Sequence, residues 1–490
     1  MSDPQQPSSR REARNLDQQE SQAAGSARGA MSPRARTGLL IGGLALVFVL
    51  LATGAVFAGV AAGRGGTPEA SSPGGNHSST PSRTVPTDAV AATAVRTCSI
   101  ADAAKDPALK TLYGSVITAG GSTLYSNSPD DGQPPASGQK VITAAAALAK
   151  LGPNFRIRTS VVDGVTPGSI TLIGRGDPTL SAVAAGKSVY AGAPTLASLA
   201  AKTIAAYNSA HPGVPISQVV LDSSYWDPSD NWDSTVPRSE QTGGFLSETT
   251  ALQVDGDRAN PSAQTSPRGT DPVMTAGKAF VAALGDPSIS LITGRAENGA
   301  PTLASVQSQP LSVLVKQMLL NSDNTLAEML ARIVSVRSSL TGSLASLAQA
   351  IPMNLSGYGI DSSGLTVHDG SGESPSDSVP ASYMSHLMQL VAAGKHGLAP
   401  VAAGMPLAGK TGSLATRFTG NNAAAAGHVY AKPGYIANSY TLSGYTTAKD
   451  GTSLAFAFFA VGDGVSGTAN GALDTLAATV YRCGKNLTSE

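Results

Sequence analysis

Hydrophobic and polar positions divide the 490-residue chain into a polar start, one long apolar run, a second polar stretch and a long mixed remainder. From Gly38 to Gly63 no charged residue occurs, and such a run is long enough to cross a bilayer as a helix. Arginines precede the run and few charges follow it, which predicts a cytoplasmic tail for residues 1–37. A cleaved signal peptide is the alternative, because Ala58 and Ala61 could support cleavage, but the long polar start favours a retained anchor at 38–63.

Residues 64–95 are rich in Gly, Ser, Thr and Pro. Such a stretch buries too little apolar surface to fold, so it predicts a flexible linker. The folded part then begins at about residue 96. It lies outside the membrane if the apolar run is an anchor, and is secreted if that run is cleaved.

Helical periodicity is clear at two places in the folded part. The segment VITAAAALAKL is apolar nearly all round, which predicts a buried helix that Gly152 and Pro153 end. The segment LSVLVKQMLL predicts an amphipathic helix, and a second helix follows because apolar residues recur with helical spacing. The residues of that second apolar face are Leu326, Met329, Leu330, Ile333 and Val334.

Strand patterns appear towards the C-terminus. Residues 429–431 have strand character, and 440–445 and 454–461 predict a hairpin that turns at 449–451.

Composition narrows the functional classes. Charged residues make up 13% of the chain and the net charge is zero, which argues against a nucleic-acid-binding surface. No Cys or His cluster has metal-ligand spacing, so we expect neither a metal nor another cofactor. The two cysteines, Cys98 and Cys483, flank the folded part. They form a disulfide if the compartment is oxidising; otherwise they are two unrelated buried thiols.

A candidate nucleophile lies at the start of the buried helix. Ser137 and Lys140 form a Ser-x-x-Lys pattern, and residues three apart in the first turn of a helix face the same way. Desolvation by the helix would lower the pKa of Lys140 and let it act as a neutral base towards the Ser137 hydroxyl. A capped helix with an exposed lysine is the simpler alternative. A Ser-His-Asp hydrolase is not favoured, because the chain contains no Gly-x-Ser-x-Gly elbow.

A Ser-x-Asn motif, which accompanies Ser-x-x-Lys in penicillin-interacting enzymes, occurs twice. One copy begins at Ser229 in a turn-forming stretch and is interpreted as a surface loop. The other, from Ser322 to Asn324, joins the two amphipathic helices. A short loop between packed helices holds side chains rigidly, as a proton relay requires, so we take this copy as functional.

Three segments together resemble one family. PPASGQKVITAAAAL, NSDNTLAEML and VHDGSGESPSDSVP are similar to the D-alanyl-D-alanine carboxypeptidase/endopeptidase family, the class C low-molecular-mass penicillin-binding proteins. GRGDPTL, LDSSYWDP and MPLAG with the later Arg-Phe resemble further blocks of that family. The resemblance runs from about Cys98 to Cys483, and the wide gap between Ser137 and Ser322 fits a family that carries inserted domains there.

The family's third motif, usually Lys-Thr-Gly on an edge strand, has two candidates. Lys410, Thr411 and Gly412 match it literally, but MPLAGKTGSLATRF occupies the stretch that the family places upstream of its lysine motif. Lys432 and Gly434 instead precede the predicted hairpin directly, as the family pattern requires. We predict Lys432 as the functional lysine and keep the segment 410–412 as the alternative.

Departures from the family pattern bear on specificity. Pro433 replaces the usual Thr, which removes a hydroxyl and a backbone N–H. Tyr435 stands where Ser or Thr is usual, although its N–H can still serve an oxyanion hole. Glu373 replaces a Leu, and Arg175 replaces a Gly. Because of Pro433 and Tyr435, recognition of a free terminal carboxylate should be weaker, so endopeptidase action on cross-links, or low carboxypeptidase activity, becomes more credible.

The resemblance implies a serine-type D-Ala-D-Ala carboxypeptidase/endopeptidase acting on peptidoglycan stem peptides and acylated by β-lactams. Ser137 would be acylated with Lys140 as base, Ser322 would relay a proton and Asn324 would hold the substrate amide. Lys432 would attract negative charge, with Gly434 and Tyr435 at the oxyanion hole. A catalytically weak peptidoglycan-binding relative and a β-lactamase are the alternatives.

The resemblance also implies an α+β fold, in which helices flank a five-stranded antiparallel sheet built from both ends of the folded chain. The penicillin-binding domain would comprise residues 96–156 and 306–490, with one or more smaller domains inserted at 157–305.

Overall fold

The computed structural model of the chain describes residues 96–489. The predicted tail, anchor and linker, residues 1–37, 38–63 and 64–95, lie outside this range. Within the described part of the chain, no helix combines the length and the apolar character needed to span a membrane.

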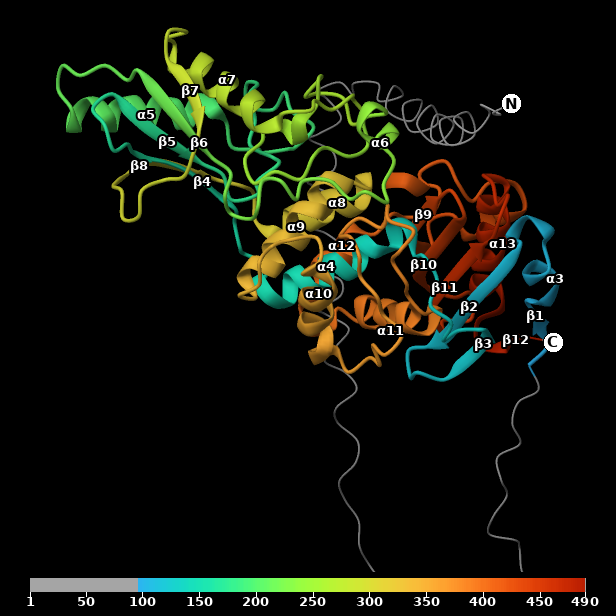
Figure 1. Ribbon diagram of the computed structural model, residues 1–490. Helices are drawn as coiled ribbons and strands as arrows, with labels where there is room; N and C mark the ends of the chain where they lie inside the picture. The colour runs from blue at the N-terminus through green and yellow to red at the C-terminus, as the bar shows by residue number, and fades with distance from the viewer. Residues whose placement is uncertain (1–95, 490) are drawn as a thin grey trace, which may run out of the picture. The chain divides into compact units, whose positions relative to one another are not determined.

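Five antiparallel strands form the first sheet, in the order β3-β2-β11-β10-β9 (Figure 1). The strands are β2 (Thr111–Thr118), β3 (Thr123–Asn127), β9 (Val429–Ile436), β10 (Ser439–Thr447) and β11 (Ser453–Val461). The hairpin predicted from residues 440–461 is β10 and β11, and its partners β2 and β3 come from the other end of the folded chain. The expected α+β fold with a five-stranded antiparallel sheet is confirmed.

Both faces of this sheet are covered, which the alternation along β11 explains. Ala455, Ala457 and Phe459 belong to the core that includes α11 (Ala381–Ala392). Phe456 and Phe458 belong to the core on the other face, with α13 (Thr468–Cys483). A strand that is apolar from Leu454 to Val461 therefore lies in the middle of a three-layer arrangement.

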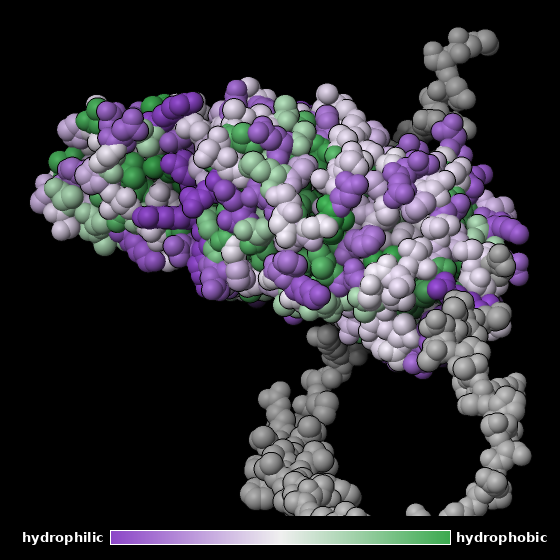
Figure 2. All heavy atoms as spheres, turned by 90° about the horizontal axis from the view of Figure 1, so that it is seen from below, coloured by the Kyte–Doolittle hydropathy of each residue, from purple (hydrophilic) through white to green (hydrophobic). Residues whose placement is uncertain are grey.

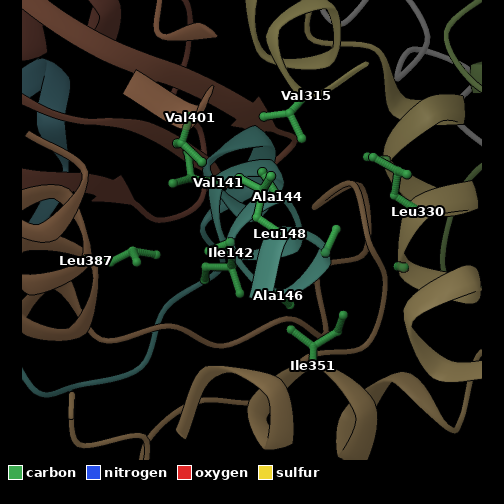
Figure 3. Packing of buried hydrophobic residues seen from close by; sticks show 14 of the residues in the cluster. Val141, Ile142, Ala144, Ala146, Leu148, Val315, Leu330, Ile351, Leu387 and Val401 are labelled. Atoms are coloured by element: carbon green, nitrogen blue, oxygen red, sulfur yellow. The ribbon is translucent and has the colours of Figure 1, made fainter. Parts of the chain in front are cut away.

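The helix α4 (Gln139–Leu151) is the centre of the larger core, as its apolar sequence predicts. Figure 3 shows Val315, Leu330, Ile351, Leu387 and Val401 from five surrounding helices arranged about it. Those helices are α8 (Leu311–Asn321), α9 (Asn324–Arg337), α10 (Leu347–Leu355), α11 and α12 (Ala399–Gly404). Each large apolar side chain buried here contributes about 1.5–3 kcal/mol relative to exposure, so the start of α4 is held firmly.

A second five-stranded sheet, in the order β7-β6-β5-β4-β8, is formed by the chain between α4 and α8. Its β5–β6 and β6–β7 pairs are parallel, while β4 pairs antiparallel with β5 and β8. The strands are β4 (Arg158–Asp163), β5 (Ser169–Ile173), β6 (Gln218–Asp222), β7 (Ser290–Thr293) and β8 (Thr302–Gln307). Two helices, α5 (Leu196–Ala210) and α7 (Pro272–Leu284), pack on this sheet around a separate core, and the short α6 (Ser239–Thr242) lies before α7 in the chain.

The two ends of the described chain are joined covalently. Cys98 and Cys483 form a disulfide with their Cα atoms 5.5 Å apart. Beside it, β1 (Cys98–Ser99) pairs in parallel with β12 (Leu487–Thr488), and α3 (Ala101–Ala104) follows β1. Of the two alternatives that the sequence left open, a disulfide or two unrelated buried thiols, the structure contains the disulfide.

Large hydrophobic side chains are scattered over the described surface. On the face shown in Figure 2, hydrophobic and hydrophilic residues are interspersed. The exposed large hydrophobic residues come from five different segments: Val165, Ile292, Val313, Met353 and Tyr430. Isolated residues of this kind are normal on soluble surfaces and need no partner.

Candidate active site

Ser137 lies in a tight turn that the sheet and α4 fix from two sides. A 3-10 turn over Ala136–Gly138 leads directly into α4. The hydroxyl of Ser439 donates to the carbonyl of Pro134 at 2.7 Å, and the hydroxyl of Thr441 donates to that of Pro135 at 2.9 Å. Ala136 adopts a left-handed φ of 46°, a conformation that costs a non-glycine residue about 1–3 kcal/mol and is frequent at functional sites.

Lys140 reaches the serine one turn further along. Its Nζ lies 2.8 Å from Ser137 Oγ and donates to the carbonyl of Ser371 at 2.7 Å. The side chain is completely buried, so the alternative of an exposed lysine on a capped helix is wrong. The i, i+3 spacing thus places an amine within proton-transfer distance of the hydroxyl.

The Ser-x-Asn copy predicted to be functional lies in the loop between α8 and α9. Ser322 ends α8 in a left-handed conformation, and the Asp323 carboxylate caps α9 by accepting from Leu326 N at 3.0 Å. This geometry directs Ser322 Oγ to Ser137 Oγ at 3.2 Å. Asn324, the first residue of α9, donates its side-chain N–H to Glu373 Oε1 at 2.8 Å.

The other Ser-x-Asn copy makes different contacts. Ser229 is exposed and its hydroxyl donates to Asp227, as expected of a surface loop. Asp230, however, accepts from the buried Arg332 of α9 at 2.7 Å and from Leu344 N at 2.6 Å. This loop therefore anchors α9 and lacks a contact with Ser137 among the described residues.

Lys432 completes the cluster from the edge strand β9. Only 1% of it is exposed, and its Nζ donates to Ser322 Oγ at 2.9 Å and to the carbonyl of Pro433 at 2.9 Å. Lys410 is exposed in a loop, where the Thr411 hydroxyl accepts from Leu407 N at 3.0 Å. Of the two candidate motifs, the structure brings 432–434 to Ser137 and leaves 410–412 on the surface.

Electrostatics around Lys432 are unusual. Burial, followed by the positive charges of Lys140 and Arg417, holds the pKa of Lys432 well below its ordinary value, and Glu373 opposes that shift. Lys432 can therefore lose its proton more readily than a surface lysine. The positive charge expected of this residue from the sequence is thus held less firmly than on a surface lysine.

The backbone of β9 closely approaches the turn that carries Ser137. A Cβ atom on Gly434 would lie 2.6 Å from Ser137 N, so only glycine fits at this position. Tyr435 follows on the strand and stacks on Tyr440, with ring centroids 5.4 Å apart. The backbone of β9 at Gly434 therefore lies directly against the N–H of Ser137.

Comparison with known proteins agrees with this geometry. The D-Ala-D-Ala carboxypeptidase 3 (S13) family model matches residues 97–284 and 268–480. The chain belongs to the S13 family. This S13 peptidase is 32% identical over 454 residues to carboxypeptidase DacB of Mycolicibacterium smegmatis, covering 90% of this chain and 95% of that protein. It is 29% identical over 446 residues to a D-alanyl-D-alanine carboxypeptidase of Actinomadura sp., covering 74% of this chain and 80% of the relative.

A solved structure supports the fold. Penicillin binding protein 4 (dacB) of Haemophilus influenzae matches with a TM-score of 0.62 and 19% identity, covering 76% of this chain and 96% of that one. The same protein complexed with a β-lactam matches with a TM-score of 0.57. Membership of the family makes this S13 peptidase a serine-type D-Ala-D-Ala carboxypeptidase.

Beside the candidate site residues of the S13 peptidase lies a group of buried carboxyls that sequence reasoning missed. Glu328 accepts from Gly370 N and Ser371 N, the latter at 2.8 Å, and Asp369 accepts from Ser374 N at 2.7 Å. These contacts fix the loop whose Ser371 carbonyl holds Lys140. Glu328 lies outside the apolar stripe of its helix, and a polar residue in such a position is usually solvent-exposed. The hydrophobic pattern of the sequence therefore did not indicate that this carboxyl is buried.

Burial raises the pKa values of these carboxyls. The pKa of Glu328 rises to about 8, because burial and then the charge of Asp369 disfavour its ionised form. The pKa of Asp377 rises well above its ordinary value, again through burial first and Asp369 second. Part of this group therefore holds protons near neutral pH.

The histidines of the S13 peptidase lie elsewhere. Within residues 96–489 they pair or stack with Asp163 (His211), Asp233 (His368), Ser382 (His386), Tyr358 (His396) and Tyr481 (His428). None of these described histidines contacts Ser137, which agrees with a lysine-assisted serine.

Proposed function

We propose that Ser137 is the acylated nucleophile of this D-Ala-D-Ala carboxypeptidase. One observation carries the proposal: Lys140 Nζ, Ser137 Oγ, Ser322 Oγ and Lys432 Nζ form an unbroken chain of contacts of 2.8, 3.2 and 2.9 Å. A serine hydroxyl between an amine and a second hydroxyl has both a base and a relay within reach.

The reaction follows from that chain. Lys140 takes the Ser137 proton as Oγ attacks the penultimate D-alanine carbonyl of a peptidoglycan stem peptide. The bond to the terminal amine breaks, and Ser322 passes a proton to that amine as it leaves. Water then attacks the ester, and the serine hydroxyl is restored.

Charge that develops on the carbonyl oxygen needs donors. The N–H groups of Ser137 and Tyr435 would supply them across the close contact at Gly434, each contributing about 3 kcal/mol to the transition state. Asn324 would hold the substrate amide. A β-lactam would acylate Ser137 by the same first step.

Pro433 favours endopeptidase action on cross-links beside the carboxypeptidase activity. Proline supplies neither the hydroxyl nor the N–H with which threonine would hold a free carboxylate. Burial also lowers the pKa of Lys432, so this lysine holds its positive charge less firmly than a surface lysine does. Both features weaken recognition of a terminal carboxylate, which a cross-linked substrate does not require.

The enzyme would act outside the cytoplasm, tethered by the apolar run 38–63 or secreted if that run is removed. A disulfide between Cys98 and Cys483 supports an oxidising compartment. Peptidoglycan is reached from that side of the membrane.

Turnover of defined muropeptides tests the proposal. Purified residues 96–490 should release D-alanine from a pentapeptide monomer and split a cross-linked dimer, and Ser322→Ala should lose most of both activities. Ser229→Ala, the matched change in the surface copy of the motif, should retain them. Equal losses in the two variants, or no turnover by the wild type, would contradict the assignment.

A further inference from the structure

Glu373 is a buried carboxylate in the active site to which the mechanism above gives no role. Only 7% of it is exposed, and its Oε1 accepts the side-chain N–H of Asn324 at 2.8 Å. It follows Gly372, whose φ is 82° and where a Cβ atom would overlap the carbonyl oxygen of Ala136. The backbone before Glu373 is thus pressed against the turn that carries Ser137.

Two buried amines contact the segments that hold this carboxylate. Lys140 Nζ donates to the carbonyl of Ser371, two residues before Glu373, at 2.7 Å, and Lys432 Nζ donates to Ser322 Oγ, two residues before Asn324, at 2.9 Å. Lys140 and Lys432 are 0% and 1% exposed, and they lie at the two ends of the hydroxyl chain through Ser137 and Ser322. Burial disfavours a protonated amine, and a neighbouring amine offers it no counter-charge, so a proton on this pair requires a nearby anion.

Other charged groups of this region have partners of their own. Arg417 is paired with Asp474, at 2.7 Å and 3.2 Å through two of its nitrogens. Asp369, on the same loop as Glu373, accepts backbone N–H groups, and Glu328 of α9 accepts others. The negative charge of Glu373 raises the pKa of Lys432, against the effect of burial and of the neighbouring positive charges.

We propose that Glu373 is the counter-charge of the Lys140–Lys432 pair, holding one proton on the two amines and so setting the pH range in which Ser137 is acylated. Glu373 is a positioning residue for charge: it contacts Asn324 and acts on the reacting serine through the lysines. The proposal rests on the proposed acyl-enzyme function, because that function makes a neutral lysine the base.

The sign of the effect follows directly. An anion beside the lysines favours their protonated forms, and the base must be neutral to accept the Ser137 proton. Removing the negative charge of Glu373 therefore makes neutral lysine available at lower pH. In a plot of the acylation rate against pH, the acid limb should therefore move to lower pH, although the active site has lost a negative charge.

Glu373→Gln tests charge with little change of shape, since its amide oxygen can still accept from Asn324. Below the midpoint of the wild-type acid limb, this variant should be acylated by a fluorescent penicillin at least about threefold faster than wild type. Glu373→Leu also removes the acceptor and should show the same shift with a lower maximal rate. Glu297→Gln, an exposed residue outside the catalytic cluster, should follow the wild-type profile.

A profile of Glu373→Gln that superimposes on wild type, with only Glu373→Leu impaired, would overturn the proposal and leave Glu373 as a holder of Asn324. NMR titration of the lysine side chains, with Lys140→Arg and Lys432→Arg for assignment, measures the ionisation of the two amines and does not depend on acylation of Ser137. It should show lysine midpoints at lower pH in Glu373→Gln, and unchanged midpoints would also overturn the proposal. Failure of the wild type to acylate would instead refute the proposed function, while the NMR titration would still decide the role of Glu373.

Discussion

Replacing Lys432 by methionine separates the two candidate third motifs most sharply. Methionine keeps most of the buried stem but removes the ammonium that donates to Ser322 Oγ at 2.9 Å. A hydrogen bond from a charged group contributes about 1.5–3 kcal/mol, so acylation should slow roughly 10- to 150-fold. Lys410→Met changes an exposed lysine in a loop, and substitutions of that kind alter rates by about twofold at most.

The assay is the second-order rate constant for acylation by a fluorescent penicillin, followed by gel fluorescence at several times for both variants and wild type. Thermal unfolding of each variant shows whether a slow rate reflects lost structure. If Lys410→Met slows acylation more than Lys432→Met does, the segment 410–412 is the functional motif. The reasoning from strand context and burial would then be refuted.

Other perturbations test the framework around the site. Arg258 donates to Asp323 at 3.0 Å with both side chains buried, so Arg258→Met leaves a buried carboxylate without its cation and should lower the free energy of unfolding by about 3–5 kcal/mol in chemical denaturation. The double change Cys98→Ser and Cys483→Ser removes a bridge that spans 385 residues and should lower the free energy of unfolding by about 2–5 kcal/mol. Without reductant its Tm should lie below that of wild type, and adding reductant should lower the Tm of wild type but leave that of the variant unchanged. For Glu328 the pKa is raised from 4.5 to about 8, so the folded state holds this proton more tightly than the unfolded chain does. Its contribution to stability is complete below pH 4.5 and is lost as the pH rises to about 8, so the Tm of wild type should fall across this window more than that of Glu328→Gln.

The sequence predicted those features that short-range patterns determine. The segment 141–151, which is apolar nearly all round, lies in the buried helix α4, because a helix without a polar face is stable only when surrounded. The hairpin over 440–461 forms β10 and β11, since its alternation and turn are local. The contact of Lys140 with Ser137 follows from a spacing of three residues in a helix.

Features that depend on distant parts of the chain were less accessible. The pairing of β2 with β11 joins segments more than three hundred residues apart and came from the family resemblance alone. The carboxyls Glu328, Asp369 and Asp377 come together only through the loop that follows α10, and single positions in a sequence do not reveal such a cluster. Glu373 was visible as a departure from the family pattern, but its contact with Asn324 required the fold.

The central claim is that Ser137 forms the acyl-enzyme. Intact-mass measurement and peptide mapping after incubation with a β-lactam test it directly, with Ser137→Ala and the exposed Ser413→Ala as a matched pair. The account predicts one adduct on the peptide that contains Ser137, present in wild type and Ser413→Ala and absent from Ser137→Ala. An adduct of equal yield in Ser137→Ala, or no adduct on wild type, would contradict it.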